Sequence, residues 1–227
     1  TIENPKFGLS SNEYGCDSSK KVIYKGVSSI KDMQSTIGDE LYKLSQKKKY
    51  NNFLSLLFDI KTKTSCNKTS LDILIKLDYF SDFGDINYLL NVVKYYNKYI
   101  DNGNFGKTKR KQFRVADLDD VKKYYPFEKE TILKFKTEES KNGNTIYVSQ
   151  ENMYKLIVYL CSKLKKNTTT LYDKITYEAT LLGYVSITSS DSPYWAVTNV
   201  DVNQYGTPFA SLYRVSDGLT EVYKVNR

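Results

Sequence analysis

Two segments of similar design carry most of the information in this chain: KGVSSIK at residues 25–31 and LIKLDYFSDFG at residues 74–84. In each, apolar residues at helical spacing lead to a lysine and then to an aspartate, Asp32 in the first and Asp78 in the second. This pattern indicates two short helix-hairpin-helix units, a motif that holds a phosphate with backbone N–H groups and the positive end of a helix. On the residues alone, an ordinary pair of packed helical hairpins explains the same pattern, and that alternative stays open.

The composition narrows the class of protein. A length of 227 residues suits one or two domains, and 40% hydrophobic with 26% charged residues is typical of a globular protein. The sequence contains no histidine, which excludes a Ser-His-Asp or Cys-His catalytic site and any histidine-ligated zinc within this chain. The three cysteines are far apart, and no apolar run is long enough to span a membrane, so we expect a cytoplasmic protein with no membrane partner. Because the chain begins at Thr1 rather than methionine, we expect it to be a piece of a longer polypeptide.

The positive charge lies in the first half of the chain. The net charge is +8, and residues 1–115 hold 20 basic and 12 acidic side chains, whereas the later segments are nearly balanced. A localised excess of this kind favours a polyanion partner such as DNA. The densest group places five cations within eight residues, on a segment that we expect to be a loop able to follow a strand of phosphates. These cations are Lys107, Lys109, Arg110, Lys111 and Arg114. A merely solvated loop explains them equally well.

Hydrophobic periodicity and capping residues predict the fold class. We expect a mostly helical α+β chain: a helix-hairpin-helix-containing domain followed by a small antiparallel β unit, divided at residues 1–105, 106–184 and 185–227. Helices are predicted after Ser35 or Thr36, at 50–61, after Asn67 or Thr69, from 85 or 86 to 100, and at 117–125, 150–166 and 176–184. Strands are predicted within 1–26 and at 132–135, 145–148, 194–202, 209–215 and 220–225, and a loop at 101–111.

Three further patterns favour structural roles over chemistry. Asp82-Phe83-Gly84 matches the metal-binding triplet of kinases but stands without the other kinase motifs. The aspartates of the segment 117–120 are placed to open a helix rather than to share a metal ion. Tyr95, Tyr96 and Tyr99 have the helical spacing of a core-facing stripe, which favours packing over base stacking. We therefore assign no catalytic and no metal-ligating residue in this chain.

Three blocks in a fixed order resemble one family, the C-family bacterial replicative polymerase, that is, the alpha subunit of DNA polymerase III. The blocks are Tyr24-Lys25-Gly26-Val27-Ser28-Ser29-Ile30-Lys31; Asn67-Lys68 with Leu74-Ile75-Lys76 and Phe80-Ser81-Asp82-Phe83-Gly84; and Glu178 with Leu181-Leu182-Gly183-Tyr184. The tail from Tyr194-Trp195 to Val225 is similar to versions of this polymerase from low-GC Gram-positive bacteria and their phages. One departure is visible, since Asp32-Met33 and Asp78-Tyr79 stand where the family has its turn glycines.

The resemblance implies that this chain is the end of the fingers, the helix-hairpin-helix domain and the start of a C-terminal β module of OB type. Its partners would be double-stranded template-primer DNA, the remainder of the polymerase and replisome proteins. The nucleotidyl transfer chemistry, with its Mg²⁺ ions, would belong to parts of the polymerase outside this chain, which itself holds no cofactor. Phosphate contacts would come from Lys25, Lys31, Lys68, Lys76, Lys107, Lys109, Arg110, Lys111 and Arg114. The alternative is a non-catalytic interaction or structural module of a replisome that has lost its DNA affinity.

Overall fold

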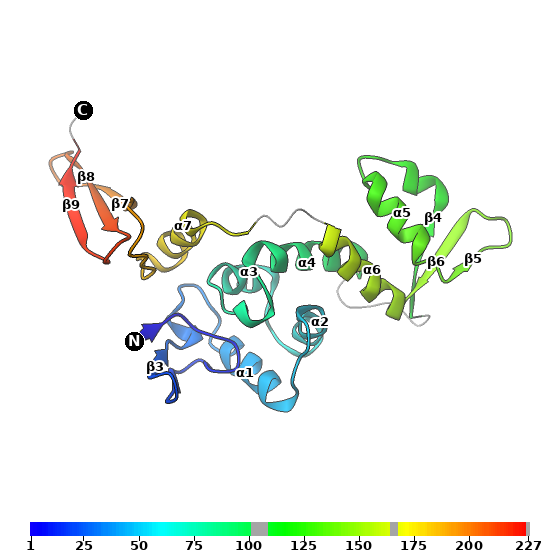
Figure 1. Cartoon of the computed structure of the whole chain (residues 1–227), viewed down its shortest axis with the longest axis horizontal. Helices are drawn as coiled ribbons and strands as arrows, with labels where there is room; N and C mark the ends of the chain where they lie inside the picture. Colours follow the sequence, from blue (N-terminus) through cyan, green and yellow to red (C-terminus); the bar gives the residue numbers. More distant parts are fainter. Residues whose placement is uncertain (101–108, 164–167, 226–227) are drawn as a thin grey trace. The chain divides into compact units, whose positions relative to one another are not determined.

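The computed structural model describes residues 1–100, 109–163 and 168–225. Over these residues the chain is α+β, as the sequence predicts (Figure 1). Most helices lie in the middle of the sequence, and a small three-stranded sheet lies near each terminus of the chain. It divides into two compact units. Unit 1 comprises Thr1–Lys47, Asn67–Ser81 and Thr169–Arg227, and unit 2 comprises Lys48–Cys66 and Asp82–Thr168. Within the described residues, no helix is long and apolar enough to cross a bilayer.

Unit 1 begins with a small sheet. Strands β1 (Ile2–Glu3), β3 (Val22–Tyr24) and β2 (Gly15–Asp17) lie in that order, with β1 parallel and β2 antiparallel to β3. The β2–β3 hairpin confirms the strands that the sequence predicts in this segment.

Helices α1 (Ile37–Lys47) and α3 (Lys68–Lys76) supply much of the core of unit 1. Helix α1 starts directly after Thr36 and ends at Lys47, as predicted, and its first turn carries two acidic residues that suit the positive helix end. Asn67 caps α3, because its Oδ1 accepts the backbone N–H of Ser70 at 2.9 Å. Fully buried side chains of the two helices are Ile37, Leu41, Leu71, Leu74 and Ile75.

Helix α7 (Leu171–Leu182) joins this core to a C-terminal sheet. A reciprocal cap starts the helix, since Thr170 Oγ1 accepts the N–H of Asp173 and the Asp173 carboxylate accepts the N–H of Thr170. Gly183 ends it in a left-handed conformation, with φ of 76°. The sheet contains β7 (Trp195–Val202), β8 (Pro208–Arg214) and β9 (Thr220–Lys224), all antiparallel, at the three predicted positions. Tyr213 of β8 and Val215 pack with Ile175 of α7.

The glutamate of the third sequence block has a structural role. The Glu178 carboxylate is 3% exposed and accepts the backbone N–H groups of Ser186 at 2.7 Å and Ile187 at 3.2 Å. It also accepts a hydrogen bond from the side chain of Asn4 at the start of the chain. Glu178 therefore ties α7 to the segment that follows it and to the N-terminal segment of the same unit.

Unit 2 is built on α4 (Ile86–Tyr99), which packs against both α2 (Phe53–Lys63) and α6 (Gln150–Lys163). Asn52 and Asp85 cap α2 and α4 through their side-chain oxygens. The short 3-10 helix η2 (Ser81–Phe83) precedes α4 in the chain. Tyr95, Tyr96 and Tyr99 are all at least 97% buried, which confirms that this stripe belongs to the core.

The remainder of unit 2 differs from the sequence prediction at three places. Strand β4 (Arg110–Arg114) pairs with β6 (Thr145–Ser149), so the end of the predicted loop is a strand; residues 101–108 lie outside the described part. The predicted helix at 117–125 is instead the 3-10 helix η4 (Val115–Asp119), which ends at the extended Asp120 and is followed by turns. Tyr125, before Pro126, is also extended. The predicted strand at 132–135 lies mostly within α5 (Pro126–Lys134).

These residues form helix α5 instead of the predicted strand because the start of the helix has strong local signals. Pro126 stands at the first helical position, and the carboxylate of Glu128 accepts the N–H of Tyr125 at 2.8 Å. On its other side β6 pairs with β5 (Glu138–Glu139), and the left-handed Gly143 lies in the turn between them. The sequence predicts the strand before this turn at 132–135 instead.

Candidate nucleic-acid interface

The first predicted hairpin is a 3-10 helix, a turn and α1. The 3-10 helix η1 (Val27–Ser29) is short, and Ile30 buries its side chain directly after it. Asp32 then adopts a left-handed backbone conformation with φ of 60°. Gly26, which directly precedes η1, is a glycine for steric reasons, since a Cβ there would lie 2.0 Å from the carbonyl oxygen of Asn12.

Asn12 forms hydrogen bonds with the first turn of α1, which belongs to this hairpin. The side-chain Oδ1 of Asn12 accepts the N–H of Gly38 in the first turn of α1 at 3.1 Å. In the other direction, hydrogen bonds from the side chain and the backbone N–H of Asn12 lower the pKa of Asp39 below its ordinary value. One N–H group of the first turn of α1 is therefore already used within the protein.

The second predicted hairpin turns through a Schellman motif at the end of α3. The N–H of Asp78 donates to the carbonyl of Ile75, and the N–H of Tyr79 donates to the carbonyl of Leu74, both at 3.0 Å. Asp78 stands at the position that is usually glycine and is left-handed, with φ of 62°. The buried rings of Tyr79 and Phe80 then anchor the turn to the core of unit 1.

Both turns therefore have the backbone shape that glycine normally supplies, with aspartate in its place. Aspartate and asparagine enter the left-handed region more readily than other side chains, because a short polar group can bond locally. Only four non-glycine residues among those described have positive φ, and Asp32 and Asp78 are two of them. The absence of glycine from these turns is thus a change of side chain and not of backbone geometry.

Two of the predicted DNA-binding lysines are engaged with tyrosines at α7. Lys25 Nζ donates to the hydroxyl of Tyr184 at 2.5 Å and lies 4.3 Å from the centre of that ring. Lys76 forms an ion pair with Asp72 at 2.7 Å and lies 5.6 Å from the ring centre of Tyr177. A phosphate would have to compete with these contacts.

Lys174 of α7 adds a third link to this region. Its Nζ lies 2.7 Å from the Asp78 carboxylate, so the second turn is held to α7 by an ion pair whose side chains are 34% and 38% exposed. Sequence reasoning missed Lys174 and Tyr177, because they lie about one hundred positions away from the hairpin and belong to no quoted motif. Tyr184 is part of the third block, but its contact with Lys25 was not predicted.

Lys31 and Lys68 are the predicted lysines best placed for an external ligand. Both side chains are exposed, and within the described residues neither has an ion-pair partner. Lys31 lies beside the left-handed Asp32, and Lys68 is the first residue of α3 after its Asn67 cap. The candidate interface of unit 1 therefore contains one exposed lysine, Lys31, beside a glycine-like turn, and a second, Lys68, at the opposite end of α3 from the turn at Asp78.

The basic cluster of the sequence belongs to unit 2 and is divided by β4. Lys107 lies outside the described residues, and Lys109, which is left-handed and exposed, directly precedes the strand. Arg110 forms an ion pair with Glu138 and lies 4.2 Å from the ring centre of Tyr147. Alternation along the strand places Arg110 and the exposed Arg114 on one face and Lys111 on the other, with the buried Phe113. The prediction of a single loop of cations is thus wrong for residues 110–114.

The residues described do not fit a magnesium site. Asp117 and Asp119 form ion pairs with Lys123 and Lys129, and across the described residues no group of three acidic or cysteine side chains is arranged to hold a metal ion.

Comparisons with known proteins leave the resemblance untested. Neither a scan against protein-family models nor a search of curated proteins found a match to this chain.

Proposed function

We propose that this chain is the duplex-binding portion of a C-family replicative DNA polymerase, and that it holds template-primer DNA through phosphates without reading base sequence. The main support is the conformation of Asp32 and Asp78. At the two positions where the family has turn glycines, both residues adopt the left-handed conformation for which glycine is selected. Two separate turns meeting this requirement is an agreement that composition and periodicity alone do not produce.

In this proposal the exposed Lys31 neutralises a phosphate beside the first turn, and the exposed Lys68 neutralises one at the start of α3. Lys25 and Lys76 contribute if DNA displaces their tyrosine contacts. Lys109, Lys111 and Arg114 of unit 2, together with Lys107, provide further phosphate contacts. Nucleotidyl transfer is assigned to other parts of the polymerase, since the described carboxylates of this chain are ion-paired or scattered.

The test is binding of a labelled DNA duplex by the parent and by the Lys31→Ala, Lys68→Ala double variant at several salt concentrations. Each lost phosphate contact reduces the slope of log K against log salt by about 0.9, so the double variant is expected to lose about 2 in slope and to weaken equally for all sequences. The control is Lys20→Ala, which removes an exposed lysine of the same unit that is already paired with Asp17. An unchanged slope in the double variant would refute the proposed contacts.

The second candidate function is an interaction module without DNA affinity. It is favoured by the internal engagement of Lys25, Lys76 and the Gly38 N–H, and by the negative charge that aspartate brings to each turn. This candidate predicts no duplex binding even at low salt, where electrostatic binding is strongest. The same titration therefore separates the two candidates.

A further inference from the structure

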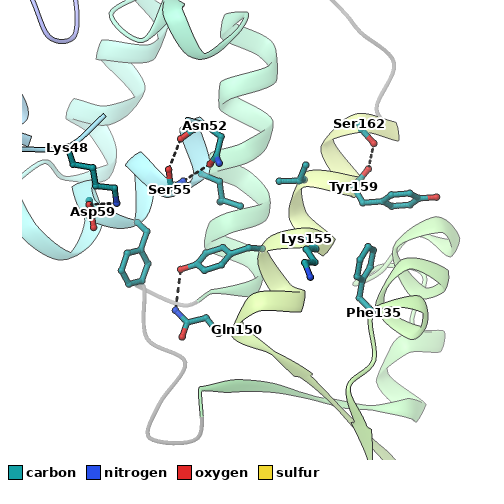
Figure 2. A pocket seen from close by; sticks show the side chains of 13 residues that line it. Lys48, Asn52, Ser55, Asp59, Phe135, Gln150, Lys155, Tyr159 and Ser162 are labelled. Atoms are coloured by element: carbon teal, nitrogen blue, oxygen red, sulfur yellow. Dashed lines mark hydrogen bonds and ion pairs between the residues drawn. The ribbon is translucent and has the colours of Figure 1, made fainter. Parts of the chain in front are cut away.

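Unit 2 contains an open groove between α2 and α6 that the proposed duplex contacts do not use. Its volume is about 760 Å³, which lies within the range of small-molecule sites, and its surface is mostly apolar (Figure 2). Every residue that lines it belongs to unit 2.

Aromatic rings line this groove. Phe58 of α2 meets Tyr154 of α6 edge to face, with ring centres 6.2 Å apart, and Phe135 meets Tyr159 in the same way at 5.8 Å. All four side chains are half-buried, so part of each ring remains accessible, and Val158 between them is 48% exposed. Accessible aromatic surface at this spacing can stack flat, unsaturated rings such as nucleobases.

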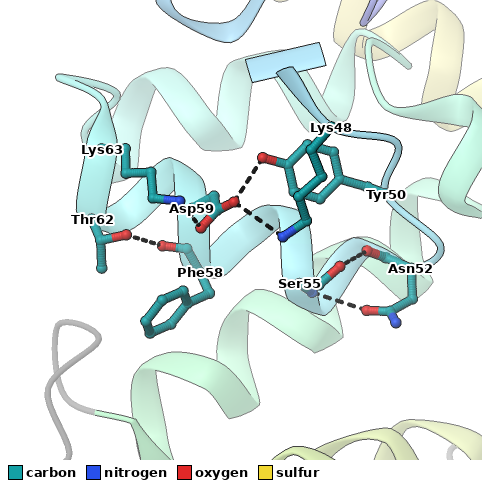
Figure 3. Close-up of polar contacts among 8 residues, drawn as sticks. All are labelled: Lys48, Tyr50, Asn52, Ser55, Phe58, Asp59, Thr62 and Lys63. Carbon is teal, nitrogen blue, oxygen red and sulfur yellow. Dashed lines mark hydrogen bonds and ion pairs between the residues drawn. The ribbon is translucent and has the colours of Figure 1, made fainter. Parts of the chain in front are cut away.

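Positive charge borders the aromatic walls on both sides. On the α2 side, the buried Asp59 carboxylate accepts the Tyr50 hydroxyl at 2.8 Å and lies 3.3 Å from Lys48 Nζ and 2.7 Å from Lys63 Nζ (Figure 3). Two lysines against one carboxylate leave this cluster with a net charge of +1, and the carboxylate holds Lys48 at the groove.

On the α6 side, Lys134 and Lys163 lie 4.4 Å and 5.2 Å from the ring centre of Tyr159. Neither has an ion-pair partner among the residues that the structure describes, and both are exposed. Lys155, which also lines the groove, is neutralised by Glu151. The rim as a whole is positive, so the occupant that fits combines negative charge with flat apolar rings.

We propose that the groove between α2 and α6 binds unpaired nucleotides of a single-stranded nucleic acid, with bases against the aromatic rings and phosphates near Lys48, Lys134 and Lys163. Asn52, Ser55 and Gln150 supply hydrogen-bonding groups beside the rings without forming a base-specific arrangement. Single-strand binding here is independent of the duplex contacts proposed for unit 1. An acidic peptide is the competing occupant, but its backbone lacks the flat rings that stack on aromatic side chains.

The experiment measures the binding of a labelled oligothymidylate to the full chain by fluorescence anisotropy. Val158→Glu places a negative charge and added bulk in the groove at a position exposed enough to be tolerated, and Tyr154→Leu removes one ring while keeping an apolar side chain. Each is expected to weaken oligothymidylate binding about tenfold, the size of one lost base–aromatic stack. The matched control is Val121→Glu, because Val121 is 69% exposed on the same unit and lies outside the groove.

A labelled duplex separates this proposal from the proposed function. Val158→Glu is expected to leave duplex binding unchanged. The double variant with Lys31→Ala and Lys68→Ala is expected to weaken duplex binding and to leave oligothymidylate binding unchanged. The proposal is overturned if the parent does not bind oligothymidylate, if Tyr154→Leu binds it within twofold of the parent, or if Val121→Glu loses as much affinity as Val158→Glu. In the first case, binding of an acidic peptide that is sensitive to Val158→Glu would identify the competing occupant.

Discussion

At the two left-handed turns, a variant with glycine is expected to be more stable than a variant with alanine. This is the reverse of their order inside a helix. Asp32 and Asp78 have φ of 60° and 62°. In this region an L-amino acid is about 1–2 kcal/mol less favourable than in the right-handed helix region, and glycine avoids that cost. Aspartate lies at the low end of this range, whereas alanine has no polar group to compensate.

The size of the effect follows from two opposing terms. Replacing Asp32 by glycine relieves roughly 1 kcal/mol of backbone strain but adds about 0.5–1 kcal/mol of conformational freedom to the unfolded chain, so the net change is within about 0.5 kcal/mol. Asp32→Ala keeps the strain and is expected to be about 1 kcal/mol less stable than Asp32→Gly, or about 2–4 °C in the midpoint of thermal unfolding for a chain of this size.

At Asp78 the same comparison carries an additional loss. Both replacements remove the ion pair with Lys174, whose side chains are partly exposed, and such pairs contribute about 0–1 kcal/mol. Asp78→Gly is therefore expected to be up to about 1 kcal/mol less stable than the parent, and Asp78→Ala about 1 kcal/mol lower again. The difference in unfolding free energy between Asp78→Ala and Asp78→Gly tests the left-handed conformation, because both variants lose the ion pair.

The assay is urea and thermal unfolding followed by far-ultraviolet circular dichroism. Gln46, exposed in α1 of the same unit, provides a control of opposite sign, because alanine is about 1 kcal/mol more stable than glycine inside an exposed helix. If alanine equals or exceeds glycine at both residues 32 and 78 while Gln46 behaves normally, the glycine-like turns, and with them the main support for the proposed function, are wrong.

Three further predictions concern the packing around these turns and the groove. Gly26→Ala places a Cβ about 2.0 Å from the Asn12 carbonyl oxygen and is expected to destabilise unit 1 by about 1–3 kcal/mol, measured by urea unfolding. Burial alone would raise the pKa of Asp59, but hydrogen bonds from Lys63, Tyr50 and Lys48 lower it overall. Its contribution is therefore complete above the ordinary pKa near 3.8 and is lost as pH falls through the folded value; an Asp59→Asn variant whose stability falls as steeply with acid as the parent's would contradict this. Glu178→Gln is expected to lose about 1–3 kcal/mol in thermal unfolding, because one of two oxygens that both accept hydrogen bonds becomes an N–H₂ group that cannot accept them; an unchanged midpoint would argue against it.

Local signals account for most of the secondary structure that sequence reasoning found. The Asn67 cap acts over a few residues and starts α3 at one of its two predicted positions. The starts of α1 and α4, after Thr36 and at Ile86, also lie at predicted positions. The strand predicted at 132–135 fails for a related reason. Ile132 and Phe135 favour a strand, but the proline and glutamate at the start of α5 fix a helix that reaches as far as Lys134.

Long-range contacts account for what sequence reasoning missed at the candidate interface. Whether Lys25 and Lys76 are available to a ligand depends on Tyr184 and Tyr177, which lie about one hundred or more residues away in the chain. The groove likewise brings together Phe58 and Tyr154, which have no shared motif. Spacing rules identify a lysine beside a turn, but they give no information on which distant side chain contacts it.

The charges at the two turns set how DNA would be held if the proposed function is correct. Lys31 is adjacent to Asp32, and the second turn pairs Lys76 with Asp72 and Asp78 with Lys174, so each turn carries little net charge. The attraction of either turn for a phosphate then rests on backbone N–H groups, with the exposed Lys31 beside the first turn only, and is weak. Affinity for a duplex then requires several such contacts to act together. Many weak, sequence-independent phosphate contacts of this kind allow a protein to move along DNA while remaining bound, which is what a polymerase requires of the part that holds its product.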